Sequence, residues 1–262
     1  RIIQDYCNMI VSSIQRSRGS YSCGGHDPFK ADRRKAFNAY ELPEACNGRT
    51  ENGVSRMNSK NIAADETYNR LTALTKDKNH WNEAILFVGE RLTDSSDRIK
   101  EKSIWLIGEM GLKYPKKAEP YISILANYLK NENPKIRERA AGALGRIGRA
   151  DDKLVEPYLN GLFALARDPV PTVRMNFIWA CENIATNAPH RFENKMGIFL
   201  ALLEDASDRV RIEAPEIFRV IGKRKPNYVK PYLPRLERLA NEDPHKVVRI
   251  HAAGAIRATV FQ

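Results

Sequence analysis

Cysteine is scarce in this chain. The four cysteines among 262 residues, Cys7, Cys23, Cys46 and Cys181, are too few for a disulfide scaffold. The longest strongly apolar run, residues 196–203, is too short to cross a bilayer. The first residues lack the layout of a secretory signal. We therefore expect a cytoplasmic protein without a transmembrane segment.

Two glycine motifs are also missing. The chain has no P-loop and no G-x-G-x-x-G run, so no nucleotide triphosphate site is predicted. The apolar content of 42% excludes a wholly disordered chain. Lys and Arg outnumber Asp and Glu by 43 to 32, which gives a net charge of +11. This excess is local, because residues 113–149 and 223–262 each carry nine basic and three acidic side chains. A polyanion partner would therefore bind near residues 113–149 or 223–262 and not over the whole surface.

A repeat of about 37 residues organises most of the chain. Five basic residues, each preceded by an aliphatic one, recur at intervals of 37, 37, 37 and 38 residues: Lys100, Arg137, Arg174, Arg211 and Arg249. We call them the anchors. They predict five units, near residues 79–115, 116–152, 153–189, 190–226 and 227–262.

Each unit is predicted to form two helices. In the second unit, Pro120, Ile122, Leu125 and Leu129 share helical spacing in a first helix. Pro134 then opens a second helix at its first position, where a missing N–H costs nothing. Since one helix pair cannot bury its own apolar face, the units must stack. The fold class is therefore all-α, an α-solenoid of about five helix pairs.

The motifs of the units resemble HEAT repeats of the short HEAT-like type over residues 79–262. The resemblance rests on the Asp168-Pro169 turn, the Val-Arg anchor and the run Ala-Ala-Gly-Ala-Leu-Gly at residues 140–145. It implies that each anchor arginine bonds the aspartate of a neighbouring turn in an internal ladder. The expected partners for Arg137, Arg174 and Arg211 are Asp168, Asp205 and Asp243. We therefore do not expect these arginines to bind a ligand.

Residues 1–78 form a head outside this period. Residues 2–16 are predicted to form an amphipathic helix, residues 43–60 a loop, and residues 63–75 a helix that caps the first repeat.

Four side chains of the head are candidate zinc ligands. Cys7, Cys23, His26 and Cys46 have the chemistry of a tetrahedral site, although only Cys23 and His26 have recognisable ligand spacing. The alternative interpretation is that these cysteines are idle or buried. Outside this site no cofactor is predicted.

The second helices are expected to line the concave surface of the solenoid. Positions two, five and nine residues after each anchor point away from the core along one stripe. These positions are Lys102, Trp105, Glu109, Arg139, Gly142, Arg146, Asn176, Trp179, Asn183, Glu213, Glu216, Val220, His251, Gly254 and Ala258. We call this set the inner stripe. Trp105 and Trp179 share one column two repeats apart, a separation of roughly 20 Å.

This stripe predicts a non-enzymatic scaffold that binds a macromolecule in its concave groove. The groove residues are Lys102, Trp105, Arg139, Arg146 and Trp179. Trp and Arg are frequent anchors of protein interfaces, so a protein partner is expected first. Stacking and phosphate contacts also suit DNA or RNA. Two other interpretations stay open. A neighbouring first helix or the head covers one or both indoles, or the chain is a tether whose basic ends bind RNA or membrane phosphates.

The stripe also resembles the HEAT-like alkylpurine DNA glycosylases. The matching residues are Trp105, Glu109, Arg139 or Arg146, and Trp179. The resemblance implies that Glu109 stabilises the sugar cation as the N-glycosidic bond of a damaged purine breaks. The chain departs from the family by having Glu for Asp and Gly142 where an Arg is expected. A resemblance to HEAT-like bilin lyases is also open, with no residue that distinguishes it.

Overall fold

The computed structural model describes residues 59–261, which lie in one compact unit, Arg56–Gln262. Within this range all regular elements are helical, and no strand occurs. The all-α prediction is therefore confirmed for the described part of the chain. The predicted helix over residues 2–16, residues 43–58 of the predicted loop over 43–60, and the four candidate zinc ligands lie outside the described residues. Residues 59 and 60 are helical, so the loop prediction was wrong there.

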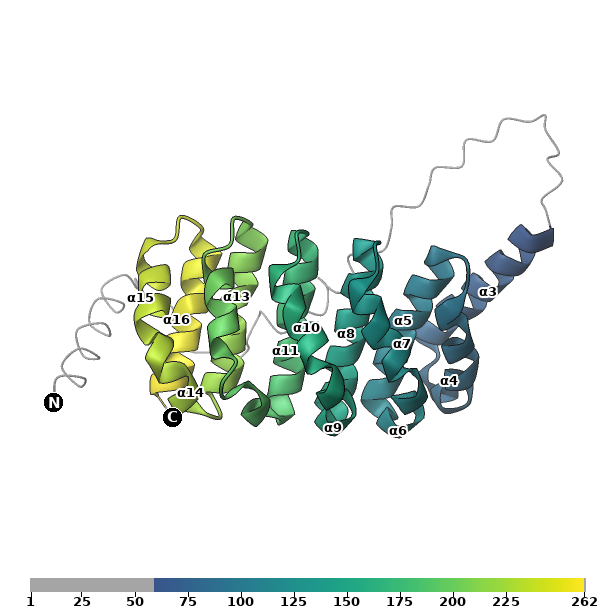
Figure 1. Cartoon of the computed structure of the whole chain (residues 1–262), viewed down its shortest axis with the longest axis horizontal. Coiled ribbons are helices and arrows are strands. Elements are labelled where there is room, and N and C mark those ends of the chain that lie inside the picture. The colour runs from purple at the N-terminus through teal and green to yellow at the C-terminus, as the bar shows by residue number, and fades with distance from the viewer. Residues whose placement is uncertain (1–58, 262) are drawn as a thin grey trace, which may run out of the picture. The chain divides into compact units, whose positions relative to one another are not determined.

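Six long helices form one layer of the structure (Figure 1). They are α3 (Ser59–Lys76), α5 (Asp97–Lys113), α8 (Pro134–Ala150), α11 (Pro171–Asn187), α13 (Asp208–Gly222) and α16 (Lys246–Val260). From α5 to α13 each helix starts 37 residues after the one before, and α16 starts 38 residues after α13. The α-solenoid predicted from the anchor spacing is thus present.

The second layer consists of shorter helices. They are α4 (Trp81–Glu90), α6 (Pro115–Ala118), α7 (Ile122–Asn127), α9 (Asp152–Val155), α10 (Leu159–Ala164), α12 (Leu200–Leu203), α14 (Pro226–Val229) and α15 (Leu233–Glu242). Turns of 3-10 helix join them: η1 (Lys78–His80), η2 (Arg91–Thr93), η3 (Glu119–Tyr121), η4 (Tyr128–Lys130), η5 (Glu156–Tyr158), η6 (Leu165–Arg167), η7 (Pro189–Phe192), η8 (Met196–Phe199) and η9 (Lys230–Tyr232).

Proline divides the first helices that were predicted to be continuous. Pro120, Pro157 and Pro231 each occupy the second position of a 3-10 turn, η3, η5 and η9. A proline lacks the N–H of the helix ladder and its ring clashes with the preceding turn. The prediction that Pro120 lies inside a first helix was therefore wrong in detail, since that helix is broken there.

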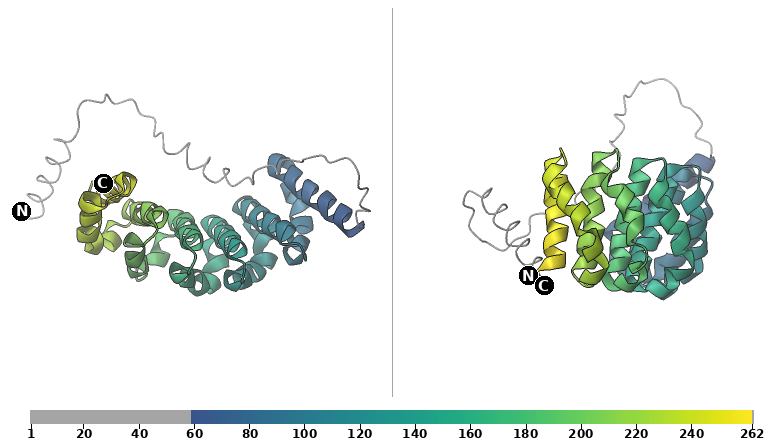
Figure 2. Two further views of the ribbon diagram at one scale, coloured as in Figure 1. Left: turned by 90° about the horizontal axis from the view of Figure 1, so that it is seen from above. Right: turned by 60° about the vertical axis from the view of Figure 1, so that its left-hand side comes forward.

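The long helices lie on the inner side of an arc within this unit, and the short helices on the outer side (Figure 2, left). Close backbone approach joins the inner helices. A Cβ atom built on Gly108 would lie 2.6 Å from the Cα of Ala143, and one on Gly145 would lie 2.5 Å from the Cα of Ala180. Helices that approach this closely on one side of a stack bend it toward that side.

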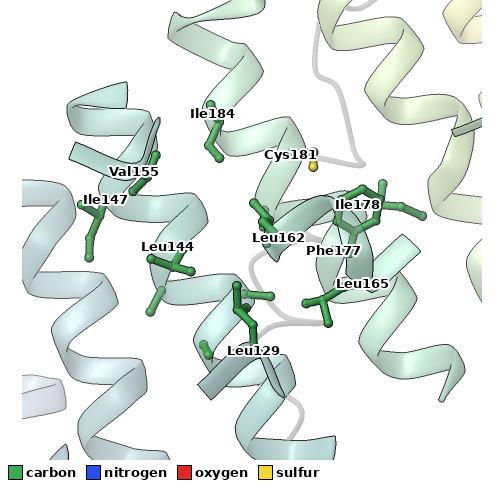
Figure 3. Packing of buried hydrophobic residues seen from close by; sticks show 14 of the residues in the cluster. Leu129, Leu144, Ile147, Val155, Leu162, Leu165, Phe177, Ile178, Cys181 and Ile184 are labelled. Carbon is green, nitrogen blue, oxygen red and sulfur yellow. The ribbon is translucent and has the colours of Figure 1, made fainter. Parts of the chain in front are cut away.

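One continuous core runs through the units. Figure 3 shows part of it, where Leu129 and Leu144 of the second unit and Leu162 and Phe177 of the third are among the labelled side chains. The rings of Phe177 and Phe199 stack at a centroid distance of 5.4 Å, which joins the third unit to the fourth. Each helix pair therefore buries its apolar face against its neighbours, as stacked repeats require.

Helix α3 continues the array by one layer. The sequence predicted it near residues 63–75 and assigned it to the head. In the structure it packs on α5 and ends 37 residues before α5 ends. Leu71 is fully buried, and the indole N–H of Trp81 donates to the carbonyl of Leu74 at 2.7 Å. Helix α3 therefore packs on the apolar side of the first unit, where the second helix of an additional, preceding unit would lie.

Candidate binding surface

The anchor arginines form the expected internal ladder. The guanidinium of Arg137 donates to both carboxylate oxygens of Asp168, with Nε–Oδ2 2.7 Å and Nη2–Oδ1 2.9 Å. It also donates to the carbonyl of Asn131 at 2.8 Å. The hydrogen bond to Asp168 raises the pKa of Arg137. Asp168 in turn accepts the backbone N–H of Val170 at 2.9 Å, which fixes its own turn.

The same ladder continues along the array. Arg174 pairs with both oxygens of Asp205, at 2.6 and 2.7 Å. Arg211 pairs with Asp243 at 2.9 Å. The prediction that these arginines are structural is therefore confirmed. The last anchor, Arg249, donates to the carbonyls of Asp243 and Pro244 at 2.6 and 3.1 Å.

The two tryptophans of the inner stripe are partly exposed. Trp105 on α5 and Trp179 on α11 both pack against the core. The ammonium of Lys102 lies 5.4 Å from the ring centroid of Trp105. The indole N–H of Trp179 donates to the carboxylate of Glu213 at 3.0 Å. Neighbouring side chains thus hold each indole in place without covering it completely.

Arg146 is not a free cation of this surface. Its side chain is 8% exposed, its Nε lies 2.5 Å from Oε1 of Glu109, and its Nη1 donates to the carbonyl of Gly142 at 3.0 Å. Burial lowers the pKa of Arg146, while the charge of Glu109 raises it. The sequence placed both residues on the binding surface, and the structure joins them in an ion pair between two repeats.

Asparagines flank Trp179 on α11. The amide of Asn176 donates to the carbonyl of Thr172, and that of Asn183 donates to the carbonyl of Trp179, both at 2.9 Å. The amide oxygen of Asn183 also accepts Nη1 of Arg149 at 3.4 Å. The sequence placed both asparagines on the stripe but not among the groove residues. Their spacing of seven residues, with Trp179 between them, is the sequence signal that could have identified them.

A separate depression of about 440 Å³ lies at the turns of the last two units. It is lined by Leu203, Glu204, Arg211, Arg235, Arg238, Leu239, Glu242 and Asp243. Each of its arginines is paired with one of its carboxylates: Arg211 with Asp243, Arg235 with Glu204 and Arg238 with Glu242. The charges of this depression are therefore balanced internally.

Within residues 64–261, no group of three or more His, Cys, Asp or Glu side chains could hold a metal ion. No helix of the described range has both the length and the apolar character needed to cross a membrane. Cys181 is fully buried in the core, where burial raises the pKa of its thiol well above 9.0.

Comparison with known proteins identifies the architecture. No protein-family model and no curated protein matches this chain. A designed armadillo repeat protein in complex with the peptide (KR)4 superposes with a TM-score of 0.61 at 18% identity, over 78% of this chain and 95% of that one. An engineered protein superposes with a TM-score of 0.62 at 16% identity, over 79% and 95% of the two chains.

A further solved structure belongs to armadillo repeat proteins computationally designed for modular peptide recognition. It matches with a TM-score of 0.51 at 17% identity, over 74% of this chain and 98% of that one. Likeness at this level of identity concerns the fold alone. The described part of the chain is an α-solenoid of helical repeats.

Proposed function

We propose that this protein is a non-enzymatic scaffold whose inner face binds an extended segment of a protein partner. The observation that carries the proposal is one column of the inner stripe. It holds the partly exposed Trp105 on α5, Gly142 on α8 and Trp179 on α11. Gly142 itself contributes no side chain to this column, and the guanidinium of Arg146 lies against it. An extended peptide of about six residues would span the two repeats that separate them.

Two further features support a peptide ligand. Equivalent positions recur at regular spacing along a solenoid, which suits the regular backbone of an extended chain. The amide oxygens of Asn176 and Asn183 can accept N–H groups from a peptide backbone. The solved structures of similar fold include scaffolds designed for peptide recognition, which favours the same use here.

Peptide selection followed by alanine substitution tests the proposal. Peptides selected from a random phage-displayed library would be synthesised and titrated calorimetrically into the full chain. We expect Trp105→Ala and Trp179→Ala each to weaken binding at least ~10-fold, as buried aromatic anchors do. Leu86→Ala is the matched control, since Leu86 is 63% exposed on α4, in the other layer. Peptides insensitive to both tryptophan variants, or a folded protein that selects none, would overturn the proposal.

The glycosylase alternative stays a prediction. The structure gives Glu109 a charge partner in Arg146 at 2.5 Å, so its negative charge is already balanced before any substrate cation forms. Release of alkylated purines from duplex DNA tests this alternative directly. Release that is lost in Glu109→Gln, with folding retained, would replace the scaffold proposal by the enzyme.

The zinc prediction for Cys7, Cys23, His26 and Cys46 also stays open. Elemental analysis of the purified chain tests it, with Cys23→Ser as the variant expected to lose the metal. A folded chain without zinc would remove the prediction.

A further inference from the structure

One guanidinium of the inner face has a buried nitrogen without a partner. Arg139 lies on α8, two residues after the anchor Arg137, and its side chain is partly exposed. Its Nε is buried, and no hydrogen-bond acceptor among the described residues pairs with it. A buried donor of a charged group is costly when it is left unpaired. Because Arg139 is partly exposed, an acceptor supplied by a ligand can balance the charge of its guanidinium.

The other cations of α8 on this face have partners within the protein. Lys135 pairs with Glu138 at 2.9 Å, and Arg146 pairs with Glu109 at 2.5 Å. Arg149 donates to Asn183 at 3.4 Å. Arg139 differs from all three, because neither a hydrogen bond nor an ion pair joins it to a described residue.

Glu101 on α5 lies within the electrostatic influence of Arg139. Burial raises the pKa of Glu101, and the charges of Arg139 and Lys135 partly oppose that rise. The charges of the two groups therefore interact, but the two side chains do not form an ion pair. The charge of Arg139 is left for another carboxylate to balance.

The column position next to Arg139 on α8 is occupied by the buried Gly142. Gly142 follows Arg139 by about one helical turn on α8. Within 4 Å, a Cβ atom built on Gly142 would meet only Nη1 of Arg146, at 3.1 Å. The guanidinium of Arg146 therefore lies against Gly142. Arg139 itself is partly exposed, so a ligand can reach it, with Trp105 on the preceding long helix and Trp179 on the following one.

We propose that Arg139 binds an aspartate or glutamate side chain of the extended partner segment, and that apolar residues on either side contact Trp105 and Trp179. This inference rests on the proposed function and specifies the class of peptide. A carboxylate matches the planar fork of a guanidinium with charge-assisted hydrogen bonds. The recognised segment is therefore acidic and apolar, opposite in charge to the (KR)4 peptide of the comparison structure.

Fluorescence anisotropy with defined probes tests the inference. The labelled probes are acetyl-(Asp-Leu)4-amide, acetyl-(Asn-Leu)4-amide and acetyl-(Lys-Leu)4-amide, titrated with the full chain. Amidated ends ensure that any carboxylate effect comes from side chains. We expect the Asp peptide to bind at least ~10-fold more tightly than the Asn peptide, as loss of a charged partner predicts. Arg139→Ala should abolish that preference.

Two variants control for charge and for folding. Arg167→Ala removes the same charge from an exposed position in η6, in the other layer, and should leave the preference intact. Arg139→Glu should reverse it, so that the Lys peptide binds more tightly than the Asp peptide. A gain of binding of this kind cannot arise from an unfolded variant.

Other outcomes separate the two proposals. Equal binding of the Asp and Asn peptides, both weakened by Trp105→Ala and neither by Arg139→Ala, would overturn the acidic-ligand inference and leave the peptide scaffold standing. If no probe binds and the library selects no peptide, the proposed function itself fails. Tighter, Arg139-dependent binding of the oligonucleotide dT8 than of any peptide would overturn the inference in favour of nucleic acid.

Discussion

The carboxylate of Glu109 on α5 and the guanidinium of Arg146 on α8 form an ion pair between adjacent repeats, with Oε1 2.5 Å from Nε. Arg146 is buried, so it needs a compensating charge within the protein. The pair therefore couples two repeats at the surface where the sequence had suggested separate binding and catalytic roles.

Neutralising Glu109 should destabilise the fold. Glu109→Gln leaves the buried Arg146 with an amide in place of its counter-ion, and we expect a loss of about 2 kcal/mol in the free energy of unfolding, less than for a fully buried pair because Glu109 is partly exposed. Urea denaturation measures the change. Glu132→Gln, at an exposed turn position, serves as the control. A Glu109→Gln variant as stable as the wild type would show that the pair contributes nothing.

The ladder should discriminate Arg from Lys. In Arg174→Lys, a single ammonium replaces a guanidinium that bonds both oxygens of Asp205 and the carbonyl of Asp168. We expect destabilisation of about 1–3 kcal/mol, since a bidentate site is not preserved by lysine. Arg249→Lys should cost less, because the described bonds of Arg249 go only to carbonyls. Equal losses in thermal or urea denaturation would contradict the ladder's carboxylate contribution.

Two glycines should respond to alanine in opposite ways. A Cβ at Gly145 would lie 2.5 Å from the Cα of Ala180, so Gly145→Ala must push α8 and α11 apart, at a cost of about 1–3 kcal/mol. A Cβ at Gly161 would lie at an ordinary 3.5 Å from a methyl carbon of Leu129. Gly161→Ala should therefore stabilise helix α10 by about 0.5–1 kcal/mol. Urea denaturation of both variants checks the signs, and a stabilising Gly145→Ala would refute the close approach.

The stability difference between wild type and Glu101→Gln should depend on pH. Burial raises the pKa of Glu101 above its ordinary value of 4.5, so the folded state holds this proton to higher pH than the unfolded state. The free energy of unfolding of the wild type therefore falls as pH rises from 4.5 through the raised pKa. Glutamine does not titrate, so the variant should be the more stable protein at pH 7.

Denaturation midpoints between pH 4 and pH 7 check this prediction. The advantage of Glu101→Gln should shrink as the pH falls toward 4, where the wild-type carboxyl gains its proton. A variant less stable than the wild type at pH 7 would mean that attraction to Arg139 and Lys135 outweighs burial.

Much of the fold was predictable because the period of the repeat can be measured directly in the sequence. The anchors predicted the spacing of the long helices, and Asp168, Asp205 and Asp243 were identified as ladder partners before the structure. The broken first helices could also have been read from Pro120, Pro157 and Pro231, since proline interrupts a helix locally. The helical spacing of the neighbouring apolar residues concealed that signal.

The candidate surface was only partly predictable. The sequence determined which residues share the inner stripe, because helical period and repeat length are properties of the chain alone. Whether Arg146 and Arg139 are free or paired depends on the distance and phase between adjacent helices. Those follow from close contacts such as Gly108 with Ala143, which join residues of different repeats. Only the tertiary structure therefore decided that Glu109 neutralises Arg146 and that Arg139, about two helical turns away on α8, is left without a hydrogen-bond or ion-pair partner among the described residues.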